Sequence, residues 1–517
     1  MIRNLLKYQY RLSIVCLCLL ARLIPGTRTI DDAFITFRYV RNILNGLGLV
    51  YNPGEAVLGT TTPFYTILLS ILGKIALAGN TDLLPVISLI VNTIADCATC
   101  LLLIAIGSYL GSIRVGFITA VLWAVAPFSV TFAIGGLETS VYVFWLVLTG
   151  YCYITKRYPL GGFAASMSLL TRPDALIFLG PIAAFRFFQL ILKKERINWS
   201  EIVLFSVPTI GWFIYAMCQF GNVLPHSIQA KLIIYHLNPY DSLIRLLQHY
   251  ATPFLDENIG GKYAIMAGII LYPFFDSIGI LRGFRKNPLL GIILGYPLVY
   301  LITFAVVNPL IFRWYLTPPL PFYFLGILLG AEKLVSDLVG LIKSYSLQRW
   351  LIAILLLGYP FSSMMTEWTL IPDHGNHTPA PKMAYIKLEL LYAQTAQKII
   401  EDESFSPNCV IAAGDVGVLG FITGAKILDT VGLNTPKSLR YYPIPAEKYV
   451  INYAIPSELI VSEQPDYLAF LDVYGKKTIL DNSKINNDYE IIFSIPTSIY
   501  GSQNLILMKN KNNPCGE

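Results

Sequence analysis

The stretch TIDDAFITFRYVRNILNGLGLVYNPGE, residues 29–55, places two adjacent carboxylates directly after the first apolar segment of a very apolar chain. Of the 517 residues, 55% are hydrophobic and 14% are charged. Apolar runs of roughly 17 to 25 residues, long enough to cross a hydrocarbon core about 30 Å thick, recur throughout the first two thirds of the chain. The net charge of +6 comes from short basic clusters between these runs, which is typical of membrane proteins and argues against nucleic-acid binding.

The number of membrane spans depends on one ambiguous apolar segment, residues 63–78. If it spans, the orientation of everything after it is reversed. If it does not, and the N-terminus is cytoplasmic, nearly every basic cluster falls on the cytoplasmic side, as the positive-inside rule requires. We therefore expect 63–78 to lie along the outer interface of a plasma (inner) membrane. The remaining segments give eleven predicted spans: 10–26, 83–107, 115–134, 137–155, 159–172, 173–192, 201–219, 262–281, 288–308, 317–335 and 350–366.

After about residue 366 the composition becomes that of a water-soluble domain. We predict a transmembrane catalytic domain, 1–366, whose first outer loop covers 27–82, and an extracytoplasmic mixed α/β domain, 367–517. An amphipathic helix is expected at 383–401. Short strands are expected at CVIAA (409–413), AKILDTV (425–431), DYLAFL (466–471), YEIIFSI (489–495) and NLILMK (504–509).

Two further features of this soluble part are informative. GDVGVLG, residues 414–420, follows a strand but lacks the dinucleotide-binding fingerprint, which favours a turn. Six of the eight cysteines lie inside or at the ends of apolar segments, where a thiol behaves as a small hydrophobe. Only Cys409 and Cys515 are therefore candidates for a disulfide.

Asp31 and Asp32 have a structural and a catalytic interpretation. A helix is expected over 32–44, so Asp31 could be its N-cap and Asp32 a first-turn acid favoured by the helix dipole. Alternatively, two carboxylates at a membrane edge could supply a general base, a divalent-metal ligand, or both. Arg38 and Arg41, three residues apart on one helix face, are expected to pair with acids or lipid headgroups.

The opening loop also carries a family resemblance. DDAFITFRYVRNILNGLGLVYNPGEAVLGTTTPFYTILLS, residues 31–70, resembles the first outer loop of bacterial GT-C glycosyltransferases. The likeness is strongest to the group that contains the mycobacterial arabinofuranosyltransferase AftB, and more distant to aminoarabinose and protein O-mannosyl transferases. It continues through GLETS, LLTRPDALI, LPHSIQAK, RWYLTPPLP and GDVGVLGFITGAKILDTVGLNTP, and so covers most of the chain.

This resemblance implies a polytopic GT-C fold, a polyprenyl-phosphate sugar donor and an envelope glycan, lipid or protein acceptor on the outer face. It also implies that an acidic residue of the first loop is the base, and Asp31 and Asp32 match that acidic pair. The sugar would be arabinofuranose or another pentose or hexose. The alternative is a transporter or flippase of lipid-linked sugars, against which stand the lack of a visible inverted repeat and of paired, broken midplane helices.

A donor of this kind needs cations near its phosphate oxygens as the glycosidic bond breaks. Each basic candidate could instead be a snorkelling anchor or a loop cation. The stretch LPHS stands where relatives usually have Pro-Asn-Thr, so His226 could alter donor contacts. The candidates are Lys231, Arg172, His226 and Arg313 for the donor phosphate, and Glu138 and Asp174 for binding or orienting the acceptor.

Polar residues elsewhere are less specific. Asn92 and Asp96 lie four apart inside a predicted span, where isolated polar groups are costly, so we expect a buried polar contact. Asp373, His374 and His377 lie in a Pro-flanked loop and are expected to be solvated rather than to bind a metal.

Overall fold

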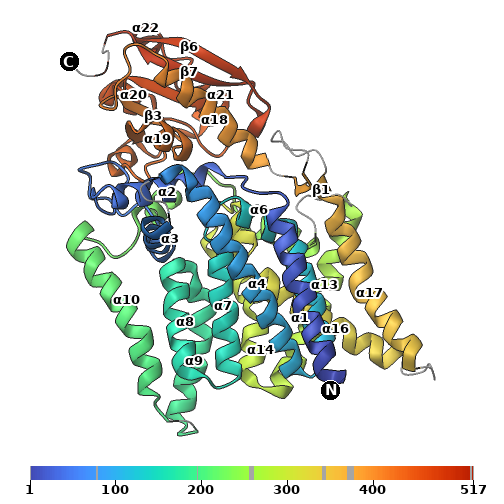
Figure 1. Cartoon of the computed structure of the whole chain (residues 1–517). Coiled ribbons are helices and arrows are strands. Elements are labelled where there is room, and N and C mark those ends of the chain that lie inside the picture. Colours follow the sequence, from blue (N-terminus) through green and yellow to red (C-terminus); the bar gives the residue numbers. More distant parts are fainter. Residues whose placement is uncertain are drawn as a thin grey trace. The chain divides into compact units, whose positions relative to one another are not determined.

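The computed structural model describes residues 2–76, 80–194, 196–254, 261–339, 345–369, 378–382, 384–512 and 515. The chain forms two compact units (Figure 1). Unit 1 contains Met1–Thr27, Ser88–Trp212 and Tyr240–Lys382, and unit 2 contains Arg28–Ile87, Phe213–Pro239 and Met383–Glu517. The predicted division at residue 366 differs from this grouping, because the first outer loop packs in one unit with the C-terminal domain. The loop with Asp373, His374 and His377 lies outside the described residues.

Unit 1 is helical, and every segment predicted as a span forms helix. By length and apolar composition, five described helices could each cross a membrane, or seven if each of two bent helix pairs is one span. The helices α4 (Leu84–Leu110) and α10 (Trp199–Phe220) contribute to both units. The others are α1 (Ile2–Leu23), α5 (Ile113–Val125), α6 (Pro127–Ile134), α7 (Thr139–Ile154), α8 (Tyr158–Thr171), α9 (Leu176–Ile191), α12 (Asp241–Ala251), α13 (Gly261–Lys286), α14 (Pro288–Leu294), α15 (Tyr296–Val307), α16 (Leu320–Val339) and α17 (Tyr345–Thr366).

The span predicted at 115–134 is broken into α5 and α6, which meet at an angle of 49°. Pro127 begins α6 and has no N–H to donate back to α5, so carbonyls of the last turn of α5 lose their helical donors. Two donors from outside the helix replace them. Arg22 Nη1 donates to the Ala124 carbonyl at 2.6 Å, and Trp368 Nε1 donates to the Val125 carbonyl at 3.1 Å. The break is tolerated because these carbonyls are satisfied, as an apolar environment requires.

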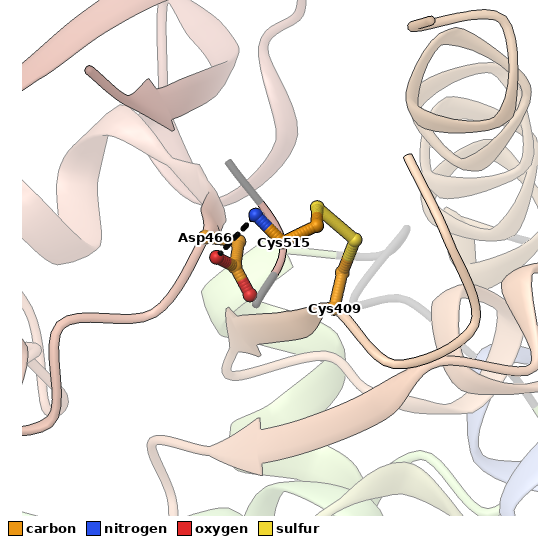
Figure 2. A group of neighbouring side chains, drawn as sticks. All are labelled: Cys409, Asp466 and Cys515. Atoms are coloured by element: carbon orange, nitrogen blue, oxygen red, sulfur yellow. Dashed lines mark hydrogen bonds between the residues drawn. A yellow bond between two sulfur atoms is a disulfide. The ribbon is translucent and has the colours of Figure 1, made fainter. Parts of the chain in front are cut away.

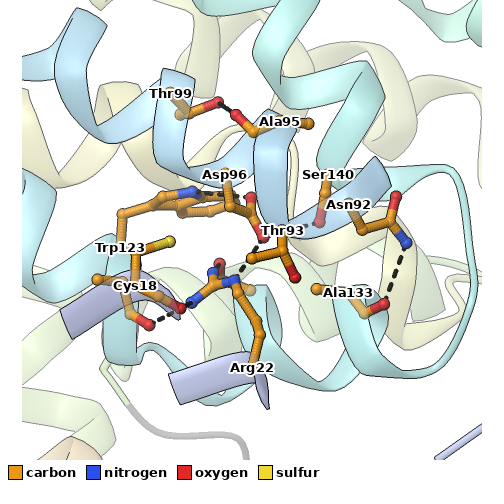
Figure 3. Close-up of polar contacts among 12 residues, drawn as sticks. Cys18, Arg22, Asn92, Thr93, Ala95, Asp96, Thr99, Trp123, Ala133 and Ser140 are labelled. Atoms are coloured by element: carbon orange, nitrogen blue, oxygen red, sulfur yellow. Dashed lines mark hydrogen bonds and ion pairs between the residues drawn. The ribbon is translucent and has the colours of Figure 1, made fainter. Parts of the chain in front are cut away.

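The buried polar contact expected at Asp96 is confirmed, and its partner is Arg22 (Figure 3). Asp96 Oδ2 accepts from Arg22 Nε at 2.8 Å and from Ser140 Oγ at 2.9 Å. Asp96 Oδ1 accepts from Trp123 Nε1 at 3.2 Å. Both charged side chains are fully buried. Helices α1, α4, α5 and α7 thus meet at one ion pair.

Asn92, one turn before Asp96 on α4, binds the C-terminal end of α6. Its Nδ2 donates to the carbonyl of Ala133 at 3.0 Å and to that of Leu137 at 2.9 Å. These carbonyls lie at and just beyond the C-terminus of α6, where intrahelical donors run out. Asn92 therefore binds carbonyls near the C-terminal end of α6. Asp96, one turn later on α4, binds Arg22, which donates to the Ala124 carbonyl at the break between α5 and α6.

Replacement of Asp96 by Leu should strongly destabilise unit 1. It leaves Arg22 as an unpaired buried charge, which costs about 3–5 kcal/mol. The double variant Arg22→Met, Asp96→Leu should be more stable than Asp96→Leu alone. Thermal unfolding in detergent measures this, with Asp337→Leu as the control, because its ion pair with Lys333 is exposed and should contribute little. Equal unfolding temperatures for Asp96→Leu and Asp337→Leu would contradict the role of the pair.

Unit 2 is built around a five-stranded sheet of order β4-β3-β5-β7-β6. β3 pairs in parallel with β4 and β5, and β7 is antiparallel to β5 and β6. All five predicted strands and the predicted amphipathic helix are present. The strands are β3 (Val410–Ala413), β4 (Lys426–Asp429), β5 (Tyr467–Leu471), β6 (Tyr489–Pro496) and β7 (Asn504–Asn510); the helices are α2 (Asp31–Leu44), α3 (Pro63–Ala76), α11 (His226–Ile234), α18 (Ala384–Ile400), α19 (Gly417–Thr423), α20 (Ser457–Glu463), α21 (Asp472–Gly475) and α22 (Ser483–Asp488).

The turn predicted for GDVGVLG is wrong in its second half, because Gly417 begins α19. The disulfide prediction is confirmed: Cys409, directly before β3, is bonded to Cys515 (Figure 2). Asp466 lies beside them and accepts hydrogen bonds from the backbone N–H groups of Val410 and Cys515, at 2.7 and 3.1 Å. The sulfurs of this group are therefore in a covalent bond and its carboxylate is satisfied by the backbone, so it is a structural group and not a metal site.

Candidate functional site

Asp31 does not cap the helix that it begins. The N-cap of α2 is Ile30, which has no side-chain cap bond, and Asp31 is already helical. Its buried carboxylate instead reaches α19, where Oδ2 accepts from Gly417 N–H at 3.0 Å and Oδ1 from Val418 N–H at 2.8 Å. These are N-terminal N–H groups that have no partner within α19. Asp31 therefore accepts N–H groups at a helix N-terminus, as the capping prediction expected. The helix is α19, however, and not α2, which Asp31 begins.

Gly417 is required for this contact. A Cβ at that position would lie 1.7 Å from the Asp31 carbonyl oxygen and 3.0 Å from Asp31 Oδ2. Only glycine lets the two backbones approach closely enough for the carboxylate to receive both N–H groups. Gly417, the second glycine of GDVGVLG, thus allows α19 to pack against the first loop.

The basic residues of α2 have different partners from those expected. Arg38 Nε donates to the Tyr51 carbonyl and Arg38 Nη2 to the Ala425 carbonyl, both at 2.8 Å, and the guanidinium stacks over the Tyr51 ring. Arg41 lies over the Phe421 ring. The prediction of acidic or lipid partners was wrong for Arg38, because buried carbonyls left unpaired by the loop needed donors. For Arg41 it stays a prediction.

Asn52 covers one edge of the sheet. Its Nδ2 donates to the Ile427 carbonyl at 2.9 Å, and its Oδ1 accepts from the Ile427 N–H at 3.1 Å. Ile427 lies on β4, an edge strand, so the amide of Asn52 supplies the pair of bonds that another strand would make. The first loop and the C-terminal domain are therefore joined by backbone-directed bonds at α19, at β4 and at the loop between them.

Asp32 is in a different environment from Asp31. It is half-buried, and no hydrogen bond reaches its carboxylate from the part of the chain that the structure describes. Burial raises the pKa of Asp32, while the positive charge of Lys231 on α11 lowers it. A carboxylate that is reachable, unbonded and balanced by one cation can take up a proton from a bound molecule.

Two further carboxylates of unit 2 lie close to this pair and were missed by sequence reasoning. Asp415, directly after β3, accepts a hydrogen bond at Oδ2 from Tyr392 Oη at 3.0 Å. Burial and the charges of Asp31 and Asp32 raise its pKa. Glu389, on α18, is buried, and burial together with the charge of Asp31 raises its pKa to about 7. The signals for Asp415 were its position after a predicted strand and its place in the GDVGVLG motif. An isolated Glu in an amphipathic helix gave no signal for Glu389.

Asp31 and Asp32 do not form a preformed divalent-metal site. Both oxygens of Asp31 already accept backbone N–H bonds. Among the described residues, no group of three Asp, Glu, His or Cys ligand atoms within 4.8 Å of one another includes Asp31 or Asp32. A Ca²⁺ or Mg²⁺ ion needs several oxygen ligands converging on one point. The residues present therefore do not fit such an ion, and we derive no chemistry through one.

The other predicted residue of unit 2, His226, begins α11. Its N–H donates to the Leu58 carbonyl at 2.8 Å, which joins the start of α11 to the first loop. Burial lowers the pKa of His226, and within the described chain its ring Nε2 has no hydrogen-bond partner. The ring is therefore neutral at pH 7 and can donate or accept a hydrogen bond without supplying charge.

Unit 1 holds the remaining predicted residues, three of which lie together. Arg172, at the end of α8, donates from Nε and Nη2 to the two oxygens of Asp174 at 2.9 and 3.1 Å. Its Nη1 donates to Glu138 Oε1, just before α7, at 3.2 Å. The Tyr315 ring lies 4.7 Å from the guanidinium. Arg172 thus neutralises two carboxylates, while Arg313 is half-buried in a short 3-10 turn, Arg313–Leu316.

Comparison with solved structures identifies the class of fold. ArnT from Cupriavidus metallidurans, bound to undecaprenyl phosphate, matches with a TM-score of 0.56 and 10% identity over 99% of both chains. The oligosaccharyltransferase AglB from Archaeoglobus fulgidus, with an inhibitory peptide and a dolichol-phosphate, also gives a TM-score of 0.56, at 12% identity over 99% of this chain and 75% of that one. The chain therefore has the GT-C glycosyltransferase fold, which confirms the predicted polytopic fold class.

Sequence comparison adds one curated relative and one family. The terminal beta-(1->2)-arabinofuranosyltransferase of Mycobacterium tuberculosis is 28% identical over 229 residues, 39% of this chain. The match spans only 34% of that relative's length. A family described as a domain of unknown function, DUF8728, matches residues 384–508, which hold α18, α19 and most of the sheet.

Asp31→Ala should destabilise unit 2, because it leaves two buried N–H groups without acceptors, at a cost of about 2 kcal/mol or more. Thermal unfolding and limited proteolysis of the purified protein measure the effect. Asp481→Ala is the matched control, since Asp481 is exposed. An Asp31→Ala protein that unfolds at the same temperature as the control would show that the Asp31 contact contributes nothing to stability.

Proposed function

We propose that this protein is a membrane glycosyltransferase that transfers a sugar from a polyprenyl-phosphate donor to an envelope glycan, lipid or protein. The observation that carries the proposal is Asp32, a reachable and unbonded carboxylate with Lys231 as its cationic neighbour. The GT-C fold supports it, as do a relative named for arabinofuranosyl transfer and a structural neighbour bound to undecaprenyl phosphate. The sugar is arabinofuranose or another pentose or hexose.

The proposed reaction is a direct displacement. The Asp32 carboxylate takes the proton of an acceptor hydroxyl, whose oxygen forms a bond to the anomeric carbon of the donor. The bond from that carbon to the phosphate oxygen breaks, and its electron pair leaves with polyprenyl phosphate. The positive charge of Lys231 stabilises the negative charge that collects on the phosphate oxygens.

Within the acidic pair, Asp32 is the proposed base and Asp31 a structural residue. Each Asp31 oxygen already accepts a backbone N–H from α19, so its carboxylate is committed to holding that helix. Lys231 is the proposed phosphate ligand because its charge acts on Asp32, and two carboxylates already compensate the charge of Arg172. Arg313 and the neutral ring of His226 remain candidates for further donor contacts, and Glu138 and Asp174 for contacts with the acceptor.

The disulfide supports an outer-face location for the soluble domain. Disulfides persist in oxidising compartments and are rare in the cytosol. Cys409 and Cys515 lie at the start of the sheet and near the C-terminal end of the chain. We therefore propose that unit 2 is extracytoplasmic, with the N-terminus of the chain in the cytoplasm of the plasma (inner) membrane, as the distribution of basic clusters predicts.

The test of the function is to incubate the purified protein with a panel of polyprenyl-phosphate sugars and to measure released polyprenyl phosphate. A glycosyltransferase breaks the glycosidic bond of one donor and moves the sugar to an acceptor. A flippase moves the intact donor between leaflets of a proteoliposome without breaking it. Intact donor under all conditions, together with leaflet exchange, would overturn the proposed function.

Asp32→Asn should lower the kcat/KM of transfer by roughly a hundredfold or more, because the amide cannot accept the acceptor's proton. The unfolding temperature should stay unchanged, since no hydrogen bond within the described residues depends on this carboxylate. Asp31→Asn serves as the comparison and should lower the unfolding temperature. Near-normal transfer by Asp32→Asn would remove the proposed base.

Lys231→Met should move the acid limb of the pH profile of kcat/KM to higher pH. The base acts when it is deprotonated, so activity rises with pH through the pKa of Asp32. Lys231 lowers that pKa, and its removal raises it. Lys476→Met, which removes an exposed cation of the same domain, is the control and should leave the profile unchanged.

The same variant tests the phosphate contact. Affinity of Lys231→Met for a non-reactive polyprenyl-phosphate analogue should fall, while affinity for the same lipid without phosphate should not, because only a charge-assisted contact is lost. An equal fall for both lipids would indicate lost packing. An unchanged pH profile with unchanged affinities would make Lys231 an interfacial anchor.

A further inference from the structure

Asp415 is a partly buried carboxylate of unit 2 that has an oxygen available to a ligand. Tyr392 fixes its Oδ2, and in the described chain no other hydrogen bond reaches the side chain, which leaves Oδ1 open. The residue is half-buried, as Asp32 is. Its place is set by the contact already described, since Asp415 lies two residues before Gly417, whose N–H binds Asp31, the neighbour of Asp32.

A second observation indicates that this region accepts a ligand. Glu389 is 8% exposed, and its Oε2 has no hydrogen-bond partner among the described residues, while Oε1 has only a 3.4 Å contact with Thr29 Oγ1. The charge of Asp31 acts on Glu389. A buried acceptor without a donor is costly, and beside other carboxylates the cost rises further. Such a site is stabilised by a molecule that brings hydrogen-bond donors.

The available groups resemble those that bind a sugar. Two carboxylates, Asp32 and Asp415, each present an acceptor oxygen, and the charges of both act on Tyr235, a partly exposed tyrosine at the end of α11. Binding sites for small polar molecules combine aromatic surface with a few placed polar groups. Adjacent hydroxyls of a saccharide offer two O–H donors on one rigid ring, whereas a lipid with one hydroxyl offers one.

We propose that Asp415 binds the acceptor, and that its free oxygen accepts a hydrogen bond from a hydroxyl next to the reacting one. The acceptor is therefore a saccharide. This inference rests on the proposed function. Tyr392 is the positioning residue that fixes the Asp415 carboxylate. The C-terminal domain thus supplies an acceptor-binding residue beside the base of the first loop. Nothing in this proposal requires Asp415 to change its protonation state.

The experiment pairs protein variants with acceptor analogues. Octyl glycosides of arabinofuranose, mannose and galactose are offered to the wild-type protein with the donor it cleaves, and monodeoxy analogues of the accepted glycoside are then compared. One monodeoxy analogue should have an acceptor KM about tenfold higher than the parent, as expected for a lost bond to a charged group. In Asp415→Asn the parent KM should rise by a similar factor, and the penalty for that analogue should shrink towards none. The KM for the donor should change less than twofold.

Stability separates binding from a structural role. The amide of Asp415→Asn can still accept from Tyr392 and removes a charge that the neighbouring carboxylates repel, so the unfolding temperature should not fall. Tyr392→Phe should raise the acceptor KM by a smaller factor than Asp415→Asn, because the carboxylate remains but is no longer fixed. Asp481→Asn, exposed on the same domain, is the control and should resemble wild type.

Several results would overturn the inference. An Asp415→Asn protein with the wild-type acceptor KM, or with the wild-type penalty for every deoxy analogue, would show that Asp415 does not touch the acceptor. Donor cleavage supported only by a lipid or peptide, and by no glycoside, would defeat the saccharide acceptor and leave the proposed function standing. Failure of the wild-type protein to cleave any donor would instead defeat the proposed function itself.

Discussion

The structure of unit 2 depends on the carboxylate of Asp31, which accepts the N–H groups of Gly417 and Val418. Successive residues of a helix point about 100° apart, so a side chain fixed on α19 directs its neighbour elsewhere. Asp32 is therefore kept out of the same contact and left without hydrogen bonds from the described residues. The two adjacent acids thus differ: the carboxylate of Asp31 stabilises the fold, and that of Asp32 is open to a bound molecule.

Other hydrogen bonds between the first loop and the C-terminal domain accompany the contact of Asp31 with α19. Arg38 and Asn52 bind backbone groups of Ala425 and Ile427, and Tyr39 Oη donates to Asn434 Oδ1 at 3.1 Å. Each bond joins the first loop to the C-terminal domain through a group that would otherwise be buried without a partner. Loss of any one leaves the others in place, but loss of Asp31 also frees the start of α19, two residues from Asp415. A substitution at Asp31 can therefore disturb chemistry without Asp31 taking part in it.

The sequence predicts the local features of this protein well. Long apolar runs predicted the helical segments, and short apolar runs predicted all five strands, because these depend on neighbours along the chain. Pro127 could also have indicated the break between α5 and α6. The pairing of Asp31 with Gly417 could not be predicted, since 386 residues separate them and an Asp at a helix start has a sufficient local explanation. For the same reason Asp415 and Glu389 were missed, and Arg22 was not recognised as the partner of Asp96, 74 residues away.

Charge distribution gives a physical reason for two substrates to bind in different ways at the proposed site. Burial raises the pKa values of Asp31, Asp32, Asp415 and Glu389, neighbouring carboxylates raise those of Asp31, Asp415 and Glu389 further, and Lys231 is the cation that acts on Asp32. A phosphate placed among these carboxylates would be repelled, whereas a neutral polyol would donate hydrogen bonds to them. The donor phosphate is therefore favoured on the Lys231 side and the acceptor on the side of Asp415. Under the proposed function, Asp32, on which the charge of Lys231 acts, takes the proton of the acceptor hydroxyl as the donor sugar separates from its phosphate.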